Sequence, residues 1–241
     1  MTSRKISIII PTLNEEEAIS RTLSAIPDNQ LNEMGYDVEV VVVDGGSGDR
    51  TRELAAIMGA KVVVEPKRGY GVPIRTGFRN STGDIIAKAD GDSTYPIEAL
   101  PQLIRIMNNE KLDFVTTDRL TLLDSQAMSF RNRFGNTLLS VLVRVFFNLN
   151  MRDTQSGMWI IRKEALNRLT LKSNLSFSQE IKIEVCHFAR LNWKEVAIRY
   201  RPRIGKAKFG SVRLGFFLVL ALLLLRVRPR HGSPRNHSKS Y

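Results

Sequence analysis

The sequence predicts an α/β domain in which helices cover both faces of a mostly parallel sheet. Short runs rich in valine and isoleucine alternate along the first half of the chain with helix-like segments of about ten residues. These runs are apolar at successive positions, which is typical of strands buried on both faces. The chain has 241 residues, of which 43% are hydrophobic. That content is enough for a core, so a disordered chain is not expected.

The predicted elements follow one another in a regular order. The first run contains four isoleucines, the second ends in four valines, the third is "KVVV", the fourth contains "IIA", and the fifth begins with "FV". A helix-like segment separates each run from the next. We therefore expect strands at 6–10, 38–43, 61–64, 84–89 and 114–117, and helices at 15–26, 49–58, 72–80 and 97–108.

Between residues 129 and 148 the apolar side chains recur at spacings of three and four, which predicts one helix with a wide apolar face. This helix either packs in the core or lies in a membrane interface, with Arg131, Arg133 and Arg144 at the level of the headgroups. The sequence leaves both interpretations open. Beyond it we expect a strand at 158–161, helices at 163–169 and 178–190, and a strand at 194–198.

We expect residues 1–212 to form one domain, followed by an apolar segment at 213–226 and a basic, disordered tail at 227–241. The twelve residues 214–225 are uncharged. As a helix they would be about 18 Å long, whereas the hydrocarbon of a bilayer is roughly 30 Å thick, so they do not span it unaided. The sequence leaves three interpretations of this segment open. It is a helix in the membrane interface, a helix that caps the domain, or the beginning of a spanning helix that is cut short.

The formal charge of +12 is concentrated near the C-terminus. No acidic residue follows Glu195, whereas eleven lysines and arginines do. Such a bias predicts an anionic partner, which is a nucleic acid, a phosphorylated substrate or an anionic membrane surface. The single cysteine, Cys186, excludes an internal disulfide and suits a reducing compartment. The apolar run 6–10 is too short for a signal peptide, so we expect no leader.

Two carboxylates, Asp90 and Asp92, follow the fourth predicted strand in the stretch "KADGDSTYP". Ligands of parallel sheets bind beyond the carboxyl ends of the strands. Two carboxylates at such an end would repel each other, and a Mg²⁺ or Mn²⁺ ion with a diphosphate would turn that repulsion into attraction. The alternative is a simple turn, since Asp-Gly is a common turn dipeptide. Acidic residues also follow the first two strands, and this context weakens the interpretation as a simple turn.

Asp44 ends the four-valine run, and its carboxylate can accept hydrogen bonds from a nucleobase or a ribose. The glycines behind it allow close approach of the backbone. The alternative is a strand-to-helix turn in which Ser47 or Asp49 caps the following helix.

The sequence does not contain the motifs of several other kinds of site. Gly69, Gly71 and Gly77 have the wrong spacing for a dinucleotide fingerprint, and the sequence contains no P-loop motif. The sequence has only three histidines and one cysteine. These are too few to favour a zinc site or a Ser-His-Asp triad.

Six stretches together carry a resemblance to a known family: "IIIPTLNEEEAI", "VVVDGGSGDRT", "KRGYGVPIRTGF", "IIAKADGDSTYP", "RDTQSGMWIIRKEAL" and "YRPRIGKAKFG". In this order the chain resembles nucleotide-sugar glycosyltransferases of the GT-A fold. It looks most like the branch that contains dolichyl-phosphate (polyprenyl-phosphate) mannosyltransferases and glucosyltransferases. The likeness covers about residues 4–212. It implies a GT-A (Rossmann-like) catalytic domain with amphipathic interface helices and a C-terminal apolar helix.

The resemblance implies roles for the residues that match. Those expected to bind the nucleotide sugar are Pro11, Thr12, Glu15, Asp44, Lys67, Asp90, Arg203 and Lys208. Those expected to be catalytic are Asp92, Arg119, Arg131 and Asp153, with Asp90 and Asp92 as the metal ligands. Those expected at the acceptor are Arg131, Ser156 and Glu180. The chain departs from the mannosyltransferase pattern at Gly45, Arg50, Thr94 and Trp159, and the donor sugar is therefore not specified.

The expected reaction is the inverting, metal-dependent transfer of a hexose from a donor of the GDP-mannose or UDP-glucose type to a polyprenyl (dolichyl) phosphate. We expect the protein to associate with a membrane surface on its cytoplasmic face. A lipid phosphate needs no strong base, because its second pKa is about 6. Asp153 is then either a base for a hydroxyl acceptor or a carboxylate that orients an arginine or a lysine.

Two rival functions remain. One is a soluble glycosyltransferase that acts on a sugar or protein hydroxyl. The other, ranked last, is a nucleic-acid-binding module, because the basic tail lacks an aromatic stacking surface. We therefore expect no nucleic acid partner, and the residues do not specify an oligomeric state.

Overall fold

The computed structural model describes residues 4–123, 126–205 and 212–227. Its strands are β1 (Arg4–Thr12), β2 (Tyr36–Asp44), β3 (Lys61–Val64), β4 (Ile85–Lys88), β5 (Phe114–Asp118), β6 (Trp159–Arg162) and β7 (Trp193–Ala197). Its α-helices are α1 (Ile19–Ser24), α2 (Asp28–Glu33), α3 (Thr51–Ile57), α4 (Gly71–Asn80), α5 (Leu100–Asn109), α6 (Phe130–Phe147), α7 (Lys163–Leu166), α8 (Phe177–Ile183) and α9 (Val212–Val227).

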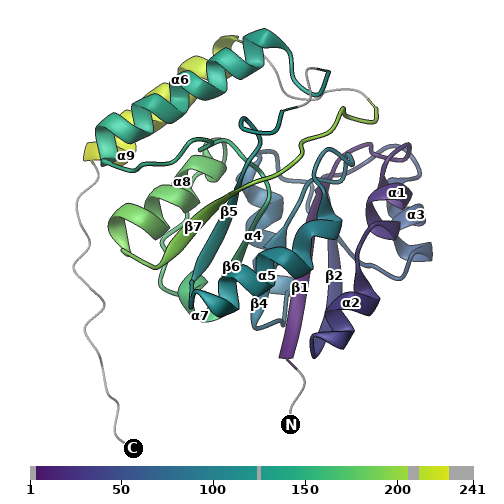
Figure 1. The fold of residues 1–241 in the computed structure, drawn as a ribbon. Coiled ribbons are helices and arrows are strands. Elements are labelled where there is room, and N and C mark those ends of the chain that lie inside the picture. The colour runs from purple at the N-terminus through teal and green to yellow at the C-terminus, as the bar shows by residue number, and fades with distance from the viewer. Residues whose placement is uncertain (1–3, 124–125, 206–211, 228–241) are drawn as a thin grey trace, which may run out of the picture.

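The strands form one seven-stranded sheet in the order β3-β2-β1-β4-β6-β5-β7 (Figure 1). Among the described strands, β6 alone runs antiparallel to its neighbours, β4 and β5. The predicted fold class, a mostly parallel sheet between helices, is therefore confirmed. Thr12 pairs with Asp44 across β1 and β2, and Ile9 pairs with Lys88 across β1 and β4. The chain leaves these three strands at the same edge of the sheet.

The apolar side chains of the sheet divide into two cores, one on each face. On one face they pack against α1, α2 and α5 through Ile19, Leu31 and Leu103. On the other they pack against α4 and α8 through Ile74 and Ile181. Strands buried on both faces explain why the valine and isoleucine runs are continuous rather than alternating.

The segment after β1 differs from the prediction of a single helix at 15–26. Asn14 has a φ of +50°, and its N–H donates to Ser47 Oγ at 2.8 Å. The N–H of Glu15 donates to Thr51 Oγ1 at 2.8 Å. These bonds hold the backbone in a loop, so α1 begins only at Ile19. The sequence analysis also missed α2, a short helix that buries Leu31.

Other boundaries moved by smaller amounts. The predicted helix at 97–108 is a 3₁₀ turn, Ile97–Ala99, followed by α5. The predicted helix at 178–190 is α8 followed by a π-helical turn, Glu184–Phe188. The predicted helix at 163–169 is shorter, because α7 ends at Leu166.

Helices α6 and α9 lie side by side above the edge of the sheet at which β1 ends (Figure 1). They share a small core with α8, in which Leu139, Val143, Leu222 and Leu225 are buried. The opposite side of α6 is exposed, so the helix is only partly a core helix. Within the residues that the structure describes, no helix has both the length and the apolar character needed to cross a membrane.

Candidate active site

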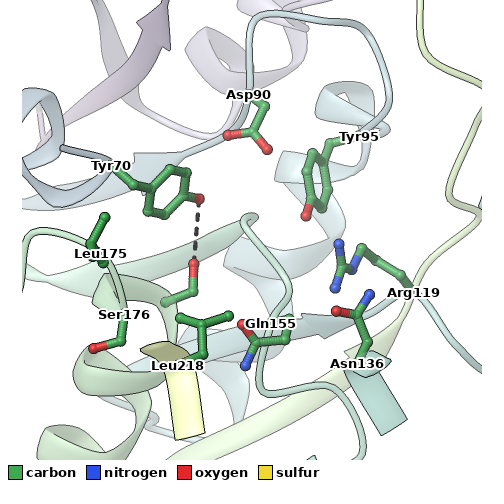
Figure 2. A pocket seen from close by; sticks show the side chains of 10 residues that line it. Tyr70, Asp90, Tyr95, Arg119, Asn136, Gln155, Leu175, Ser176 and Leu218 are labelled. Carbon is green, nitrogen blue, oxygen red and sulfur yellow. Dashed lines mark hydrogen bonds between the residues drawn. The ribbon is translucent and has the colours of Figure 1, made fainter. Parts of the chain in front are cut away.

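A cavity of about 250 Å³ lies between the carboxyl ends of β4 and β5 and the helices α6, α8 and α9 (Figure 2). It is lined by Tyr70, Asp90, Tyr95, Arg119, Asn136, Gln155, Leu175, Ser176, Ser178 and Leu218. Figure 2 shows Asp90 on one side of the cavity and Leu218 on the opposite side. The cavity therefore has a charged side, formed by strand ends, and an apolar side, formed by a loop and α9.

Asp92 is buried beside the cavity and is held from two directions. Its Oδ1 accepts from the N–H and Oγ1 of Thr94, at 3.1 and 2.6 Å. Its Oδ2 lies 3.2 Å from Nη1 of Arg203. Burial and the neighbouring charge of Asp90 raise the pKa of Asp92, against the opposing effects of Thr94 and Arg203. The charge of Asp90 is thus close enough to disfavour ionisation of Asp92, in line with the repulsion that the sequence predicts.

Asp90 lies on the wall of the cavity, and its Oδ1 accepts from Nζ of Lys88. Lys88 is wholly buried, and its Nζ also donates to the hydroxyl of Tyr70 at 2.9 Å. Burial by itself lowers the pKa of Lys88, but the charge of Asp90 and the hydrogen bonds to Asp90 and Tyr70 outweigh it, and the net pKa is raised. Lys88 is therefore a charged ammonium group at the base of the site.

Arg119 and Asp153 form a buried, two-pronged ion pair. Nε of Arg119 donates to Oδ2 at 2.7 Å, and Nη2 donates to Oδ1 at 2.9 Å. The guanidinium also lies 5.3 Å from the ring centroid of Tyr200. Burial raises the pKa of Asp153, but the charge of Arg119 outweighs it and the net pKa is lowered. Asp153 is thus an ionised partner that fixes the orientation of Arg119.

The loop that leads into β6 carries Asp153 and is held by side chains from several elements. Nζ of Lys182, on α8, donates to the carbonyl oxygens of Asp153 and Ser156 at 3.1 and 2.8 Å. Glu195, on β7, accepts from the N–H of Asp153 at 2.8 Å. Burial lowers the pKa of Lys182 to about 7. These contacts fix Gln155 of the same loop at the cavity wall.

The residues expected at the nucleoside lie on the far side of Asp92, in the loops after β1 and β2. Asp44 is fully buried, and its Oδ1 accepts from the N–H groups of Gly46 and Ser47 at 3.0 and 2.8 Å. It therefore stabilises the strand-to-helix turn between β2 and α3. However, the cap position of α3 is Arg50, so neither Ser47 nor Asp49 occupies it. Lys67 is exposed nearby, after β3.

Arg203 connects this nucleoside side to the acidic pair. Its Nη2 donates to Oε1 of Glu15 at 2.5 Å, while Nη1 contacts Asp92. Its Nε is buried and has no hydrogen-bond partner among the described residues. Pro11 and Thr12 end β1 beside these groups. The structure thus brings Glu15, Asp92 and Arg203 together, although they are far apart in the sequence.

Of the predicted site residues that the structure describes, only Asp90 and Arg119 line the cavity. Ser156 is fully buried, and its hydroxyl is 2.6 Å from that of Thr117. Glu180 is buried on α8 and accepts from the N–H groups of Lys172 and Ser173. Arg131 is exposed on the first turn of α6. Lys208 lies outside the described residues.

Comparisons with known proteins define the family. The model of the family described as "Glycosyl transferase family 2" matches residues 7–170. The chain belongs to this family. It is therefore a glycosyltransferase. The match includes most of β1, all of β2 to β6 and the segments that carry Asp44, Asp90 and Arg119.

Relatives agree with this assignment over nearly the whole chain. The sequence is 33% identical over 227 residues to a dolichyl-phosphate hexose transferase of Haloferax volcanii, covering 92% of this chain and 96% of the relative. It is 37% identical over 110 residues to a dolichol-phosphate mannosyltransferase of Pyrococcus furiosus, covering 44% of this chain and 30% of that protein.

A solved structure shares the fold. The glucosyl-3-phosphoglycerate synthase of Mycobacterium tuberculosis, crystallised with Mn²⁺, UDP and glucosyl-3-phosphoglycerate, matches with a TM-score of 0.70 at 23% identity, over 92% of this chain and 80% of the other. At this identity the likeness establishes the GT-A fold that the sequence predicted.

Several cavity residues were missed by the sequence analysis, among them Tyr70, Tyr95, Asn136 and Leu218. One signal for the site was present in the sequence. Lys88 is a charged residue at the end of an apolar strand, directly before the two carboxylates. A lysine at such a position is buried only if it is paired.

Proposed function

We propose that the chain transfers a hexose, with inversion, from a nucleotide sugar of the GDP-mannose or UDP-glucose type to a polyprenyl phosphate of the dolichyl type. One observation carries this proposal. The cavity has Asp90 and Arg119 on its charged side and Leu175 and Leu218 on its apolar side. Such a cavity suits an acceptor with an anionic head and a hydrocarbon chain. The names of the relatives, a dolichyl-phosphate hexose transferase and a dolichol-phosphate mannosyltransferase, support the same acceptor class.

The donor would bind along the edge formed by the ends of β1, β2 and β4. Asp44 and Glu15 lie on the nucleoside side of this edge, and Arg203 bridges from Glu15 to Asp92. The unused Nε–H of Arg203 is a donor that a phosphate oxygen of the nucleotide would satisfy. The resemblance to the family assigns the same group of residues to the donor.

The residues at the end of β4 fit a divalent cation. Their carboxylate oxygens are ligands that Mg²⁺ and Mn²⁺ prefer. Burial and the charge of Asp90 raise the pKa of Asp92, and a cation would stabilise the ionised carboxylate against both. No cluster of three or more His, Cys, Asp or Glu side chains that would hold a metal occurs in the described part of the chain. We therefore propose that Asp90 and Asp92 hold the ion together with the donor diphosphate. When bound, the ion would stabilise the negative charge of the departing nucleotide.

The acceptor phosphate would be positioned by Arg119. Asp153 accepts hydrogen bonds from Nε and Nη2 of this arginine. The third nitrogen, Nη1, has no hydrogen-bond partner among the residues that the structure describes. A phosphate oxygen is already ionised at neutral pH, so it attacks without a strong base. The chain's task is then to hold that oxygen in line with the anomeric carbon. Of the two roles open for Asp153, the two-pronged pairing favours the orienting one.

The reaction is tested by incubating the purified protein with polyprenyl phosphate and a panel of labelled GDP- and UDP-sugars, with and without Mg²⁺ or Mn²⁺. We expect one label to enter the organic phase, only when metal is present, and the Asp92→Ala variant to lose this transfer. Label that instead appears on a water-soluble acceptor such as 3-phosphoglycerate, with none in the lipid, would refute the proposed acceptor. Undiminished transfer by Asp92→Ala would refute the metal site.

We also propose that the exposed side of α6 and α9 rests on a membrane surface. Phe130 and Val145 of α6 are 84% and 70% exposed. Phe134 and Leu138 on α6, and Leu220 and Leu224 on α9, are exposed as well. The exposed Arg131, Arg133 and Arg144 flank this face and suit anionic headgroups. The cavity reaches both helices through Asn136 and Leu218, so a lipid acceptor could enter from this side.

Vesicle binding tests this surface. The Phe134→Glu and Val145→Glu variants should bind anionic vesicles at least about tenfold more weakly, because each places a charge in the apolar interface. The matched control is Ile57→Glu, since Ile57 is 71% exposed on α3, away from the α6 and α9 pair. If all three variants bind like the unmodified protein, this face does not contact the membrane.

A further inference from the structure

The four residues of β4 are all buried, and the last of them is a lysine. Lys88 is 1% exposed. Burial of an ammonium group is strongly unfavourable unless a carboxylate and further hydrogen bonds compensate for the lost water. The proposed transfer does not use this side chain, since it does not reach the cavity. Its position therefore calls for an explanation of its own.

Both partners of Lys88 do line the cavity. Its Nζ donates to Oδ1 of Asp90 and to the hydroxyl of Tyr70, and it lies 5.1 Å from the centroid of the Tyr70 ring. Asp90 and Tyr70 both face the open space in Figure 2. The buried ammonium group thus stands directly behind two groups that would meet a ligand.

The opposite side of this ammonium group is closed by the loop that enters β6. A Cβ added at Gly157 would lie 2.9 Å from Nζ of Lys88, 2.9 Å from Oδ2 of Asp90 and 3.0 Å from the hydroxyl of Tyr95. A larger residue at this position would therefore displace one of these three polar groups. The backbone at Gly157 thus packs closely against Lys88 and Asp90.

The second carboxylate of the pair also has a cation of its own. Arg203 lies 3.2 Å from Oδ2 of Asp92. Two basic side chains of the protein thus oppose the two acidic side chains at the end of β4. The net charge that a divalent cation would encounter there is much smaller than the sequence motif alone suggests.

We propose that Lys88 is a positioning residue with an electrostatic role: it fixes the carboxylate of Asp90 at the cavity wall and weakens the binding of a divalent cation that arrives without a nucleotide. This inference rests on the metal site in the proposed function. The same positive charge favours a diphosphate. The site would therefore bind metal tightly only together with the anionic nucleotide.

The test is to measure binding of Mn²⁺ alone, and of UDP and GDP alone, to the unmodified protein and to Lys88→Met. A positive charge within a few ångströms of both ligands acts on them with opposite sign. We expect Mn²⁺ to bind Lys88→Met about tenfold more tightly, and the nucleotides to bind it about tenfold more weakly. A variant whose site is merely damaged would lose affinity for both. Weaker or unchanged binding of Mn²⁺ would overturn the inference.

Two comparisons keep the test decisive. Lys163→Met is the matched control, because Lys163 donates to the carbonyl of Ser81 and follows the strand that pairs with the start of β4. It should change neither affinity. If Lys88→Met does not fold, Asp90→Asn is compared with Lys88→Met/Asp90→Asn.

The double variant removes both charges, so it should melt at a higher temperature than Asp90→Asn, which leaves the buried ammonium group unpaired. It should also bind UDP and GDP more weakly than Asp90→Asn. Equal melting temperatures and equal nucleotide affinities would overturn the inference. If the unmodified protein binds no Mn²⁺ even with nucleotide present, the proposed metal site itself is wrong.

Discussion

At the scale of single residues, the proposed role of Asp92 conflicts with the stability of the fold. Its carboxylate is buried beside that of Asp90, and its pKa is raised even though Arg203 and Thr94 oppose this. In the absence of a ligand, the ionised form of Asp92 therefore lowers the free energy of unfolding. A residue that costs stability in this way is typical of a binding site rather than of a core.

Asp92→Asn should reduce metal-dependent transfer at least about a hundredfold, yet slightly raise the free energy of unfolding. The native pKa lies above the ordinary value of 3.8, so the cost of ionisation is absent below pH 3.8 and grows as the pH rises through the native pKa. Urea unfolding of both proteins across this pH range measures the difference. A variant that is less stable than the unmodified protein at pH 7 would contradict this account.

Asp153→Asn should have the opposite effect on stability. It leaves the buried guanidinium of Arg119 without a carboxylate, which should lower the free energy of unfolding by about 3–5 kcal/mol. The native pKa of Asp153 is below 3.8, so its contribution is complete above pH 3.8 and is lost as the pH falls through the native pKa. Urea unfolding at pH 7 and below pH 3.8 measures both effects.

The control for this pair is Arg119→Met/Asp153→Asn, in which neither charge is left alone. It should unfold at a higher urea concentration than Asp153→Asn. Replacing both side chains leaves no unpaired buried charge, whereas replacing Asp153 alone does. A double variant that is no more stable would show that the two side chains do not act as a pair.

Some candidate site residues could be proposed from the sequence because their chemistry is local. Asp90 and Asp92 are only two positions apart, so the sequence itself shows them as a pair. Arg203 could be assigned only from the family resemblance, since no spacing connects it with Glu15. The partners of Lys88 and the burial of Ser156 depend on which loops the sheet brings together. They could not be predicted from the sequence.

At the scale of elements, glycines decide how closely helices approach the sheet. A Cβ on Gly77 of α4 would lie 2.4 Å from Cγ2 of Ile9 on β1, so α4 sits directly on the strand. Gly135 of α6 has nothing within 4 Å of the same position. The two glycines are both helical, and they differ in their surroundings.

Gly77→Ala should lower the free energy of unfolding by about 1–3 kcal/mol, because the added methyl group overpacks the core. Gly135→Ala should raise it by about 0.5–1 kcal/mol, because alanine is the better helix former. Denaturant unfolding of the two variants checks both signs. If both variants change the free energy of unfolding equally, helix propensity alone determines the effect of the added methyl group. The contact with Ile9 would then contribute nothing.

Long, regular elements were predicted well, and short ones were not. The apolar spacing and Ser129, whose hydroxyl accepts from the N–H of Asn132, define α6 almost to the residue. α2 has six residues and one buried apolar side chain, so its sequence carries little periodicity. The start of α1 depends on side chains of another loop, which no local pattern records.

At the scale of the whole molecule, the formal charge of +12 should make membrane binding depend on salt. Screening lengths fall from about 10 Å at 0.1 M salt to about 3 Å at 1 M. Binding to anionic vesicles should therefore weaken steadily over this range, and neutral vesicles should bind more weakly at low salt. Co-sedimentation measures both. Binding that does not depend on salt or on lipid charge would leave only the apolar contacts of α6 and α9.

The reversed direction of β6 also bears on how such an enzyme diversifies. Because this strand returns between β4 and β5, the chain after Arg119 supplies most of the side chains that line the cavity, including Leu175 and Leu218, while the first 119 residues, with Arg203, build the proposed donor side. Two parts of the chain thus meet at the proposed reaction centre. Grafting the later part of a relative onto this scaffold should exchange the molecule that receives the sugar and leave the choice of nucleotide untouched.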